Sequence, residues 1–134
     1  MKVHGSCHCG GIQYEATVDP ELTTICHCTD CQKLSATAYR VSVRAAPGSF
    51  RLLQGEPKVY IKIGSSGARR AQAFCPNCGS QLYVTDADTP GIYGLRVGCI
   101  DERAALVPRK QIWCRSALPW TERLGAIERR DMAG

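Results

Sequence analysis

The stretch Cys26-His27-Cys28-Thr29-Asp30-Cys31 places three thiols within six residues. Sulfurs that are spaced so closely can all bind one metal ion from the same side. Zinc takes four ligands in a tetrahedron, and a catalytic site keeps its fourth position for water or substrate, whereas a four-cysteine site is structural. The stretch therefore predicts a zinc site whose fourth position decides between catalysis and a purely structural role.

Two further pairs of cysteines lie on either side of this stretch, in Cys7-His8-Cys9-Gly10-Gly11 and in Cys75-Pro76-Asn77-Cys78-Gly79. In both, glycine follows the second thiol and lets the backbone turn sharply, so that two sulfurs can converge on one ion. The second pair, with two thiols three residues apart and a proline between them, is typical of a zinc knuckle.

The chain of 134 residues contains nine cysteines. An odd number at metal-like spacings favours metal binding over a framework of disulfides, and it suits a reducing compartment. The start of the chain has no apolar run before Cys7, which argues against a cleaved signal peptide. An apolar fraction of 44% suffices for a core but not for a membrane span. We expect one cytoplasmic domain that does not enter a membrane.

The formal charge of +5 invites a nucleic-acid interpretation. Seven thiolates and two zinc ions would lower this charge to about +2, however, and a balance so mild predicts little about partners. Basic and aromatic residues also do not alternate at a regular spacing. Both observations argue against nucleic-acid binding.

Between the cysteines, apolar and polar residues alternate in short runs that predict β-strands. In residues 12–18, the side chains of Ile12, Tyr14, Ala16 and Val18 fall on one face at period two. Further strands are expected over residues 39–44, 50–53, 58–63, 82–84, 92–97 and 111–114, with Val59, Ile61 and Ile63 facing inward. Strands this short, separated by frequent turns, are typical of a small all-β protein.

One short helical turn is expected after the three clustered thiols. Thr29 or Asp30 can cap it, and it should run to about Leu34. Cys31 would then lie near a helix start, where the positive end of the helix dipole favours a thiolate.

The cysteines and their neighbours resemble the glutathione-dependent formaldehyde-activating (GFA) family, which includes centromere protein V. The matching residues are Cys7-x-Cys9-Gly10, Cys26-x-Cys28-x-x-Cys31, Phe50-Arg51-Leu52, Gly55, Tyr60, Phe74-Cys75-x-x-Cys78-Gly79-Ser80, Gly98-Cys99-Ile100-Asp101, Ile112-Trp113, Ser116 and Pro119-Trp120. The resemblance implies an all-β, zinc-stapled β-tent fold of small antiparallel sheets. It covers residues 4–120 as a single zinc-binding domain and leaves 121–134 as a charged tail. The family usually has glycine where this chain has Ala36.

The resemblance also implies two zinc ions per chain. Cys7, Cys9, Cys75 and Cys78 would form a structural site, and the three clustered thiols would hold a catalytic zinc. The spacing is compatible with this partition, because each outer pair offers only two ligands and needs the other to complete a tetrahedron.

The implied activity is that of a zinc-dependent carbon–sulfur lyase, similar to S-(hydroxymethyl)glutathione synthase. Such an enzyme adds a small thiol such as glutathione to a small aldehyde such as formaldehyde, with Cys26, Cys28 and Cys31 at the catalytic centre. Three thiolates make zinc a weak Lewis acid that suits an incoming thiol better than water. The alternative is a non-catalytic zinc-binding module for interaction with protein or nucleic acid.

Several residues outside the cysteine clusters have two interpretations. Cys99 and Cys114 are expected to be small buried residues in strands, with a fourth ligand as the alternative. His8 and His27 are expected to point away from the metal, although His27 could donate a hydrogen bond to a ligand sulfur or a substrate.

Two further groups of side chains leave their roles open. Trp113 and Trp120 are expected in the core rather than against a substrate. Two carboxylates on a ligand like glutathione would need cationic partners. The sequence does not choose among the candidates, which are Lys33, Arg69, Arg70 and Arg96.

Overall fold

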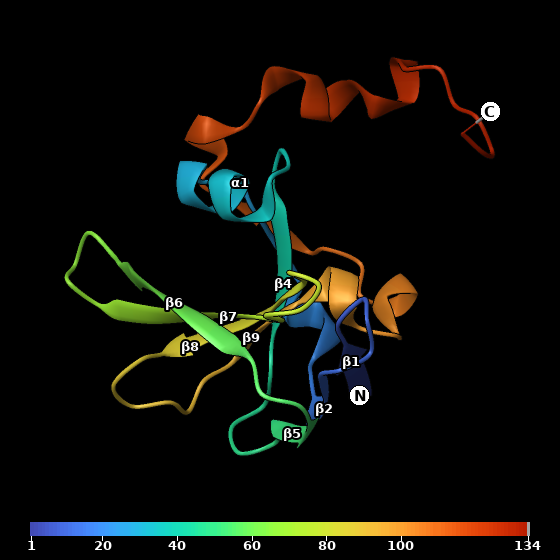
Figure 1. Cartoon of the computed structure of the whole chain (residues 1–134). Helices are drawn as coiled ribbons and strands as arrows, with labels where there is room; N and C mark the ends of the chain where they lie inside the picture. The colour runs from blue at the N-terminus through green and yellow to red at the C-terminus, as the bar shows by residue number, and fades with distance from the viewer. Residues whose placement is uncertain (134) are drawn as a thin grey trace.

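The computed structural model describes residues 1–133, most of whose regular structure is short β-strands in two sheets (Figure 1). The strands are β1 (Lys2–Ser6), β2 (Gln13–Thr17), β3 (Thr24–Cys26), β4 (Arg40–Arg44), β5 (Arg51–Gln54), β6 (Lys58–Ile63), β7 (Arg69–Phe74), β8 (Gln81–Asp86), β9 (Gly94–Arg96) and β10 (Lys110–Ile112). The helices are α1 (Thr29–Ser35) and the 3-10 helices η1 (Pro20–Leu22), η2 (Val97–Cys99), η3 (Arg103–Ala105), η4 (Cys114–Ser116) and η5 (Pro119–Ala126). The predicted fold class is confirmed.

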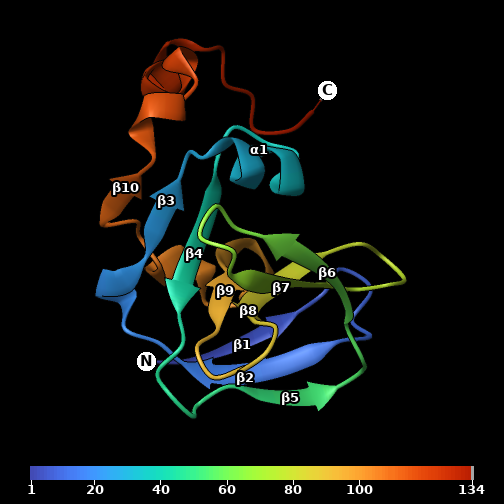
Figure 2. The ribbon, with the colours of Figure 1, turned by 90° about the vertical axis from the view of Figure 1, so that its left-hand side faces the viewer.

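The smaller sheet has the order β1-β2-β5 and is antiparallel throughout. Its inner face follows from the period-two pattern, since Val3, Tyr14, Ala16 and Val18 are all buried. Figure 2 shows this sheet beneath the strands β6 to β9 of the larger sheet. The core lies between the two sheets.

The larger sheet has the order β10-β3-β4-β9-β8-β7-β6. Its strands pair in antiparallel fashion except that β10 runs parallel to β3, which differs from the expected purely antiparallel arrangement. Residues opposite one another on neighbouring strands share a face. Val43 and Leu95 are paired and belong to the core, whereas the neighbouring pair of Ser42 and Arg96 faces the other way.

The prediction that Val59, Ile61 and Ile63 face a core is wrong. β6 is the edge strand of the larger sheet and pairs only with β7. Val59 and Ile63 remain 44% and 61% exposed, and Ile61 is half-buried. The alternation correctly predicts the strand, but it cannot show that the core ends before the sheet does.

The two tryptophans and the two remaining cysteines also differ from expectation. Trp113 and Trp120 are 57% and 48% exposed, so neither is a core residue. Cys99 is half-buried in η2, and Cys114 is exposed in η4, so neither lies in a strand. The cause is the same for all four residues, because the chain leaves the larger sheet in short 3-10 turns rather than in strands.

The end of the chain lies apart from the two sheets, above α1 (Figure 1). Residues 121–126 of the expected tail belong to η5, and residues 127–133 have no regular secondary structure. Gly134, the last residue of that tail, lies outside the described residues. No helix within residues 1–133 is long and apolar enough to cross a membrane.

Candidate metal centres

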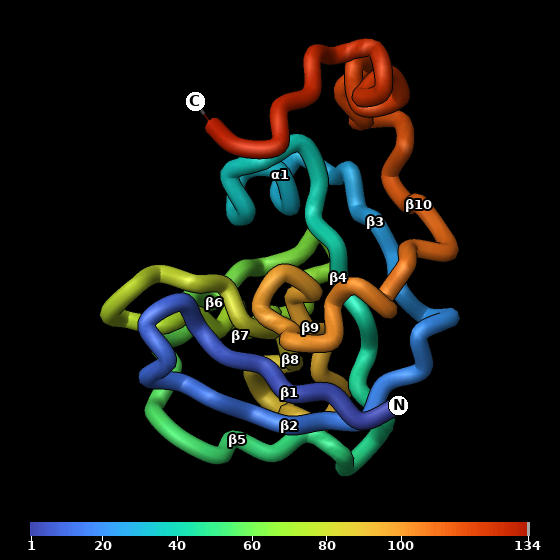
Figure 3. The backbone as a smooth tube through the Cα atoms, turned by 90° about the vertical axis from the view of Figure 1, so that its right-hand side faces the viewer, coloured from blue at the N-terminus to red at the C-terminus, as the bar shows by residue number. Residues whose placement is uncertain are grey.

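The structure brings four of the predicted ligands together at one end of the two sheets. Cys7 and Cys9 lie in the turn between β1 and β2, and Cys75 and Cys78 lie in the turn between β7 and β8. Figure 3 shows the two turns side by side, in blue and in yellow-green. The four sulfurs all lie within 4.8 Å of one another, and this group joins segments that are 66 residues apart in the chain.

Two of the sulfur–sulfur distances in this cluster are 3.5 Å, from Cys7 to Cys9, and 3.8 Å, from Cys9 to Cys75. A tetrahedral zinc with Zn–S bonds of about 2.3 Å separates its ligand sulfurs by about 3.8 Å. Four soft sulfur donors at this spacing fit zinc in both number and chemistry.

Backbone amides support the sulfurs of this cluster. The Ile12 amide donates to Cys7 Sγ at 3.2 Å, and the Cys78 amide donates to Cys75 Sγ at 3.5 Å. A hydrogen bond from the Ser80 hydroxyl lowers the pKa of the Cys78 thiol to about 5. Such donors favour the thiolate form that binds a metal.

The second cluster unites Cys26, Cys28 and Cys31 where β3 leads into α1. Cys26 ends β3, Cys28 precedes α1 and Cys31 lies in its first turn, with the three sulfurs within 4.8 Å of one another. Among residues 1–133, no other cysteine, histidine, aspartate or glutamate joins this group. We call these residues the thiol trio.

The N-cap of α1 differs from the expectation. Neither Thr29 nor Asp30 caps the helix; instead Cys28 is the N-cap, and its Sγ accepts a hydrogen bond from the Cys31 amide at 3.2 Å. The same sulfur can therefore cap the helix and serve as a ligand. The short helix fixes two of the three thiols relative to each other.

Arg40 adds a positive charge directly beside the trio. It lies opposite Cys26 in the register of β3 and β4, and its Nη2 donates to Cys31 Sγ at 3.2 Å. Its Nη1 is buried and has no hydrogen-bond partner among the described residues. A second cation, Lys62, pairs with Asp30 in the first turn of α1 at 3.0 Å.

Two opposing effects act on the pKa of the Cys31 thiol. Burial, followed by the neighbouring thiol of Cys28, raises the pKa of the Cys31 thiol to about 12. The positive charge of Arg40 acts in the opposite direction. A bound cation would act in the same sense as Arg40, so metal binding and deprotonation of Cys31 reinforce each other.

The remaining predicted residues lie outside both clusters. His8 is exposed in its turn and His27 is buried, with its Nε2 2.7 Å from Gln111 Oε1 and its ring edge-on to Tyr39. The Cys99 thiol donates to the Gln81 carbonyl, and Cys114 belongs to neither group. Neither cysteine supplies a fourth ligand to the trio in the described structure.

Sequence reasoning missed Arg40. The only signal in the sequence is its position in an alternating run shortly after the trio. The position of Arg40 can be related to the trio only once the pairing of β3 with β4 is known, because the register places Arg40 opposite Cys26.

Comparison with known proteins gives three concordant findings. Residues 2–116 match the sequence profile of a family described as "Glutathione-dependent formaldehyde-activating enzyme". The chain is 23% identical over 139 residues to a Halomonas elongata protein named "Putative glutathione-dependent formaldehyde-activating enzyme", an alignment that covers all of this chain and 88% of the relative. The fold is similar to that of a Rhodobacter sphaeroides protein known from a crystal structure, with a TM-score of 0.61 and 20% identity over 83% of this chain and 99% of that one.

Proposed function

Because the chain belongs to the family of glutathione-dependent formaldehyde-activating enzymes, we propose that it is a carbon–sulfur lyase that joins a small thiol to a small aldehyde. Glutathione and formaldehyde are the proposed substrates, and S-(hydroxymethyl)glutathione is the product. Residues 4–120 would form the catalytic domain of a cytoplasmic enzyme. Two zinc ions would be bound per chain.

The two cysteine clusters suit different roles. Cys7, Cys9, Cys75 and Cys78 can complete a tetrahedron on their own, which is typical of structural zinc. The thiol trio supplies three ligands, which is typical of catalytic zinc. The observation that carries the proposal is that no fourth protein ligand joins the trio within residues 1–133.

The reaction requires a reactive sulfur and a place for the charge that develops on oxygen. Zinc bound at the trio supplies a Lewis acid that lowers the pKa of an incoming thiol. The substrate sulfur attacks the aldehyde carbon and forms the carbon–sulfur bond, while the electron pair of the carbonyl double bond moves to oxygen. That oxygen finally takes up the proton that the thiol has lost.

Arg40 would reduce the electrostatic repulsion between the site and an incoming thiolate. Three thiolates and one zinc ion carry a net charge of about −1, which repels a second anion. The guanidinium that contacts Cys31 offsets this charge. The hydrogen bond from the Cys31 amide to Cys28 Sγ reduces the charge on a second ligand sulfur.

The test combines metal analysis with a rate measurement. The wild-type protein should contain two zinc ions and accelerate the exchange between glutathione, formaldehyde and their adduct, followed by NMR. Cys28→Ser should lose one zinc ion and the acceleration while keeping its far-UV circular dichroism. Cys114→Ser, an exposed cysteine outside both clusters, is the matched control and should behave as wild type.

Two results would contradict the proposal. A wild-type protein that holds two zinc ions but leaves the exchange at its spontaneous rate would be the non-catalytic zinc module instead. A Cys28→Ser variant that fails to fold, with Cys114→Ser intact, would show that the trio is a structural site.

A further inference from the structure

A groove of about 590 Å³ is lined by residues of the larger sheet, among them Thr24, Ser42 and Arg96 on three neighbouring strands. Five of its lining residues are basic and one is acidic, and that acid, Glu21, lies 3.3 Å from Arg109. Within residues 1–133, none of the other four basic residues forms an ion pair; they are Arg44, Arg70, Arg96 and Lys110. The groove therefore carries an excess of positive charge.

Arg96 is the least expected member of this set, because only 7% of it is exposed. Its guanidinium donates to Ser42 Oγ at 2.9 Å and to Gln72 Oε1 at 2.7 Å, both of which are neutral. Burial, and next the positive charge of Arg40, lower the pKa of Arg96 to about 9. Burying a charge without an opposite charge is costly. An anion in the groove would remove this cost.

The groove and the trio lie on one face of the sheet. Thr24, Ser42 and Arg96 are opposite one another on β3, β4 and β9, and Cys26 lies opposite Arg40 two residues further along. Residues two apart in a strand point to the same face and are separated by about 7 Å. Arg40 thus lies between the trio, which it contacts, and the pocket that Arg96 lines.

The basic residues of the groove are not needed to neutralise the charge of a zinc ion bound at the trio. One guanidinium, that of Arg40, already offsets the net charge of about −1 that zinc and three thiolates would carry. Arg96, Arg70 and Arg44 remain as additional cations. Asp86 lies opposite Arg70 and accepts hydrogen bonds from the amides of its own turn.

We propose that this groove binds the carboxylate groups of the thiol substrate, with Arg96 and Arg70 as residues that determine specificity for an anionic thiol. The inference rests on the proposed function for the position of the sulfur. An extended peptide advances about 3.5 Å per residue, so a carboxylate one or two residues from a thiol lies on the order of 7 Å from the sulfur. This is comparable to the spacing of about 7 Å along β4 between Arg40, which contacts the trio, and Ser42, which lines the groove. A thiol without a carboxylate would bind without this contribution.

The direct test uses S-methylglutathione, which has both carboxylates but no free thiol. Calorimetric titration of the zinc-loaded protein should detect binding, and Arg96→Gln should weaken it about tenfold or more, as expected for a lost hydrogen bond between charged groups. Arg70→Gln should weaken it less. The control is Arg51→Gln on the outer side of the smaller sheet, which should bind as wild type.

Arg96→Gln carries a risk to folding, because Ser42 and Gln72 lose their donor. Arg96→Lys, which keeps the charge, and the exposed Arg44→Gln therefore accompany it, each checked by circular dichroism. Arg96→Lys should bind better than Arg96→Gln. Equal binding by wild type and by all groove variants, or no binding by wild type, would overturn the proposal.

A kinetic comparison separates this proposal from the proposed function. Glutathione diethyl ester lacks both carboxylate charges, and its KM should exceed that of glutathione about tenfold, with kcat little changed. Equal KM values would refute the groove while leaving the enzyme activity intact. Absence of turnover with either thiol would refute the activity, and the S-methylglutathione titration would still decide the role of the groove.

Discussion

Ala36 ends α1 in the left-handed conformation, with φ of 55°. This conformation costs a residue with a Cβ about 1–2 kcal/mol, and glycine escapes most of that cost. A glycine, which the resemblance to the family leads us to expect at this position, would suit this helix end. We predict that Ala36→Gly raises the free energy of unfolding by about 0.5–1 kcal/mol, because relief of the left-handed conformation outweighs the larger entropy that glycine loses on folding. Urea denaturation measures the change.

The matched control for this variant is Ala46→Gly, since Ala46 is exposed and has an ordinary backbone conformation. This control should lower stability slightly, as glycine does wherever no positive φ is required. If both variants lower stability by the same amount, the left-handed conformation of Ala36 does not limit the stability of the helix end.

At the scale of single residues, the sequence predicts features that depend on neighbouring residues in the chain, but not those that depend on how distant strands pair. The trio and each outer pair of thiols could be predicted from local spacing, whereas the meeting of the two outer pairs, 66 residues apart, was implied by the resemblance to the family. The contact of Arg40 with the trio could not be predicted, nor could Arg96 be chosen from the four candidate cations, because both depend on the register of β3, β4 and β9. Cys28 as helix cap was missed for another reason, since sulfur is a weaker acceptor than the oxygen of Thr29 or Asp30.

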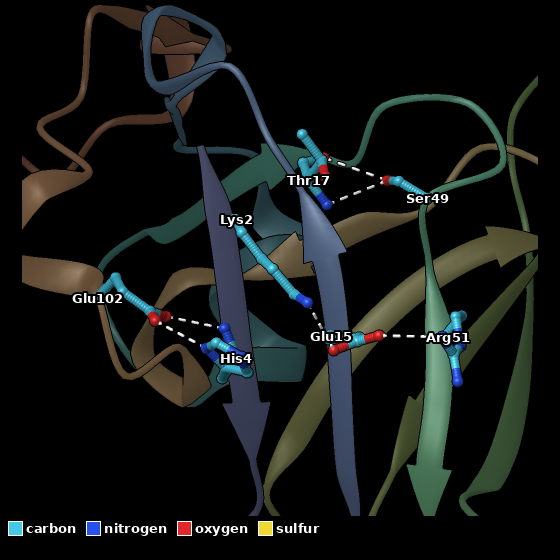
Figure 4. A network of polar contacts seen from close by, with 7 residues as sticks. All are labelled: Lys2, His4, Glu15, Thr17, Ser49, Arg51 and Glu102. Atoms are coloured by element: carbon cyan, nitrogen blue, oxygen red, sulfur yellow. Dashed lines mark hydrogen bonds and ion pairs between the residues drawn. The ribbon is translucent and has the colours of Figure 1, made fainter.

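At the scale of elements, the smaller sheet is tied together by charges across its outer face. Glu15 on β2 lies between Lys2 on β1, at 3.2 Å, and Arg51 on β5, at 3.3 Å (Figure 4). His4 and Glu102 form a second contact, which links β1 to the turn before η3. The hydrogen bond from Lys2 holds the pKa of Glu15 below its ordinary value.

This lowered pKa predicts how the stability depends on pH. A carboxylate whose pKa is lower in the folded state stabilises the protein above its unfolded pKa, and this contribution disappears as pH falls through the folded value. Glu15→Gln should therefore lower Tm at pH 7 and differ little from wild type near pH 3. Thermal denaturation of both proteins at each pH measures the difference. Glu56→Gln, at an exposed position without an ion pair in the described chain, should show no such pH dependence.

The turn after β5 contains a close backbone approach that only glycine permits. Gly55 has φ of 81°, and a Cβ there would lie 2.3 Å from the carbonyl oxygen of Gly11. Gly48 has a similar φ of 75° but nothing within 4 Å. We predict that Gly48→Ala costs about 1 kcal/mol and that Gly55→Ala costs about 1–3 kcal/mol more. Chemical denaturation of the two variants isolates the contact, and equal costs would show that the Gly11 backbone moves aside.

The elements show where alternation of side chains stops being informative. The inward face of β2 could be predicted, because strict period two in a half-buried strand has one meaning. β6 has the same pattern at an edge of the sheet, where no second layer covers it. Pattern alone also cannot show that β10 pairs with β3 in parallel, because that pairing joins segments more than 80 residues apart.

At the scale of the whole molecule, the four-sulfur cluster connects the two sheets. Cys7 follows β1 of the smaller sheet, and Cys75 follows β7 of the larger one. Both residues are almost fully buried and belong to the core. Zinc at such a site contributes on the order of 10 kcal/mol or more to folding, which is comparable to the entire stability of a small domain. The trio lies outside this core and draws its ligands from β3, α1 and the short connection between them.

Loss of the two proposed zinc ions should therefore have different consequences. We predict that a chelator first removes the zinc of the trio, since three protein ligands hold it less tightly than four, and that far-UV circular dichroism is unchanged at this step. Removal of the second zinc should coincide with cooperative unfolding. A chromophoric chelator and circular dichroism followed in the same sample give the order of the two events.

Two cysteine variants assign each step of zinc release to one of the two clusters. Cys75→Ser should abolish the cooperative transition or fail to fold, because it leaves three ligands and a buried hydroxyl at the junction of the sheets. Cys26→Ser should remove only the first chelation step, since it leaves the four-sulfur cluster intact. Zinc loss from both sites without a change in circular dichroism would contradict this account, because packing between the sheets would then hold the fold without the metal.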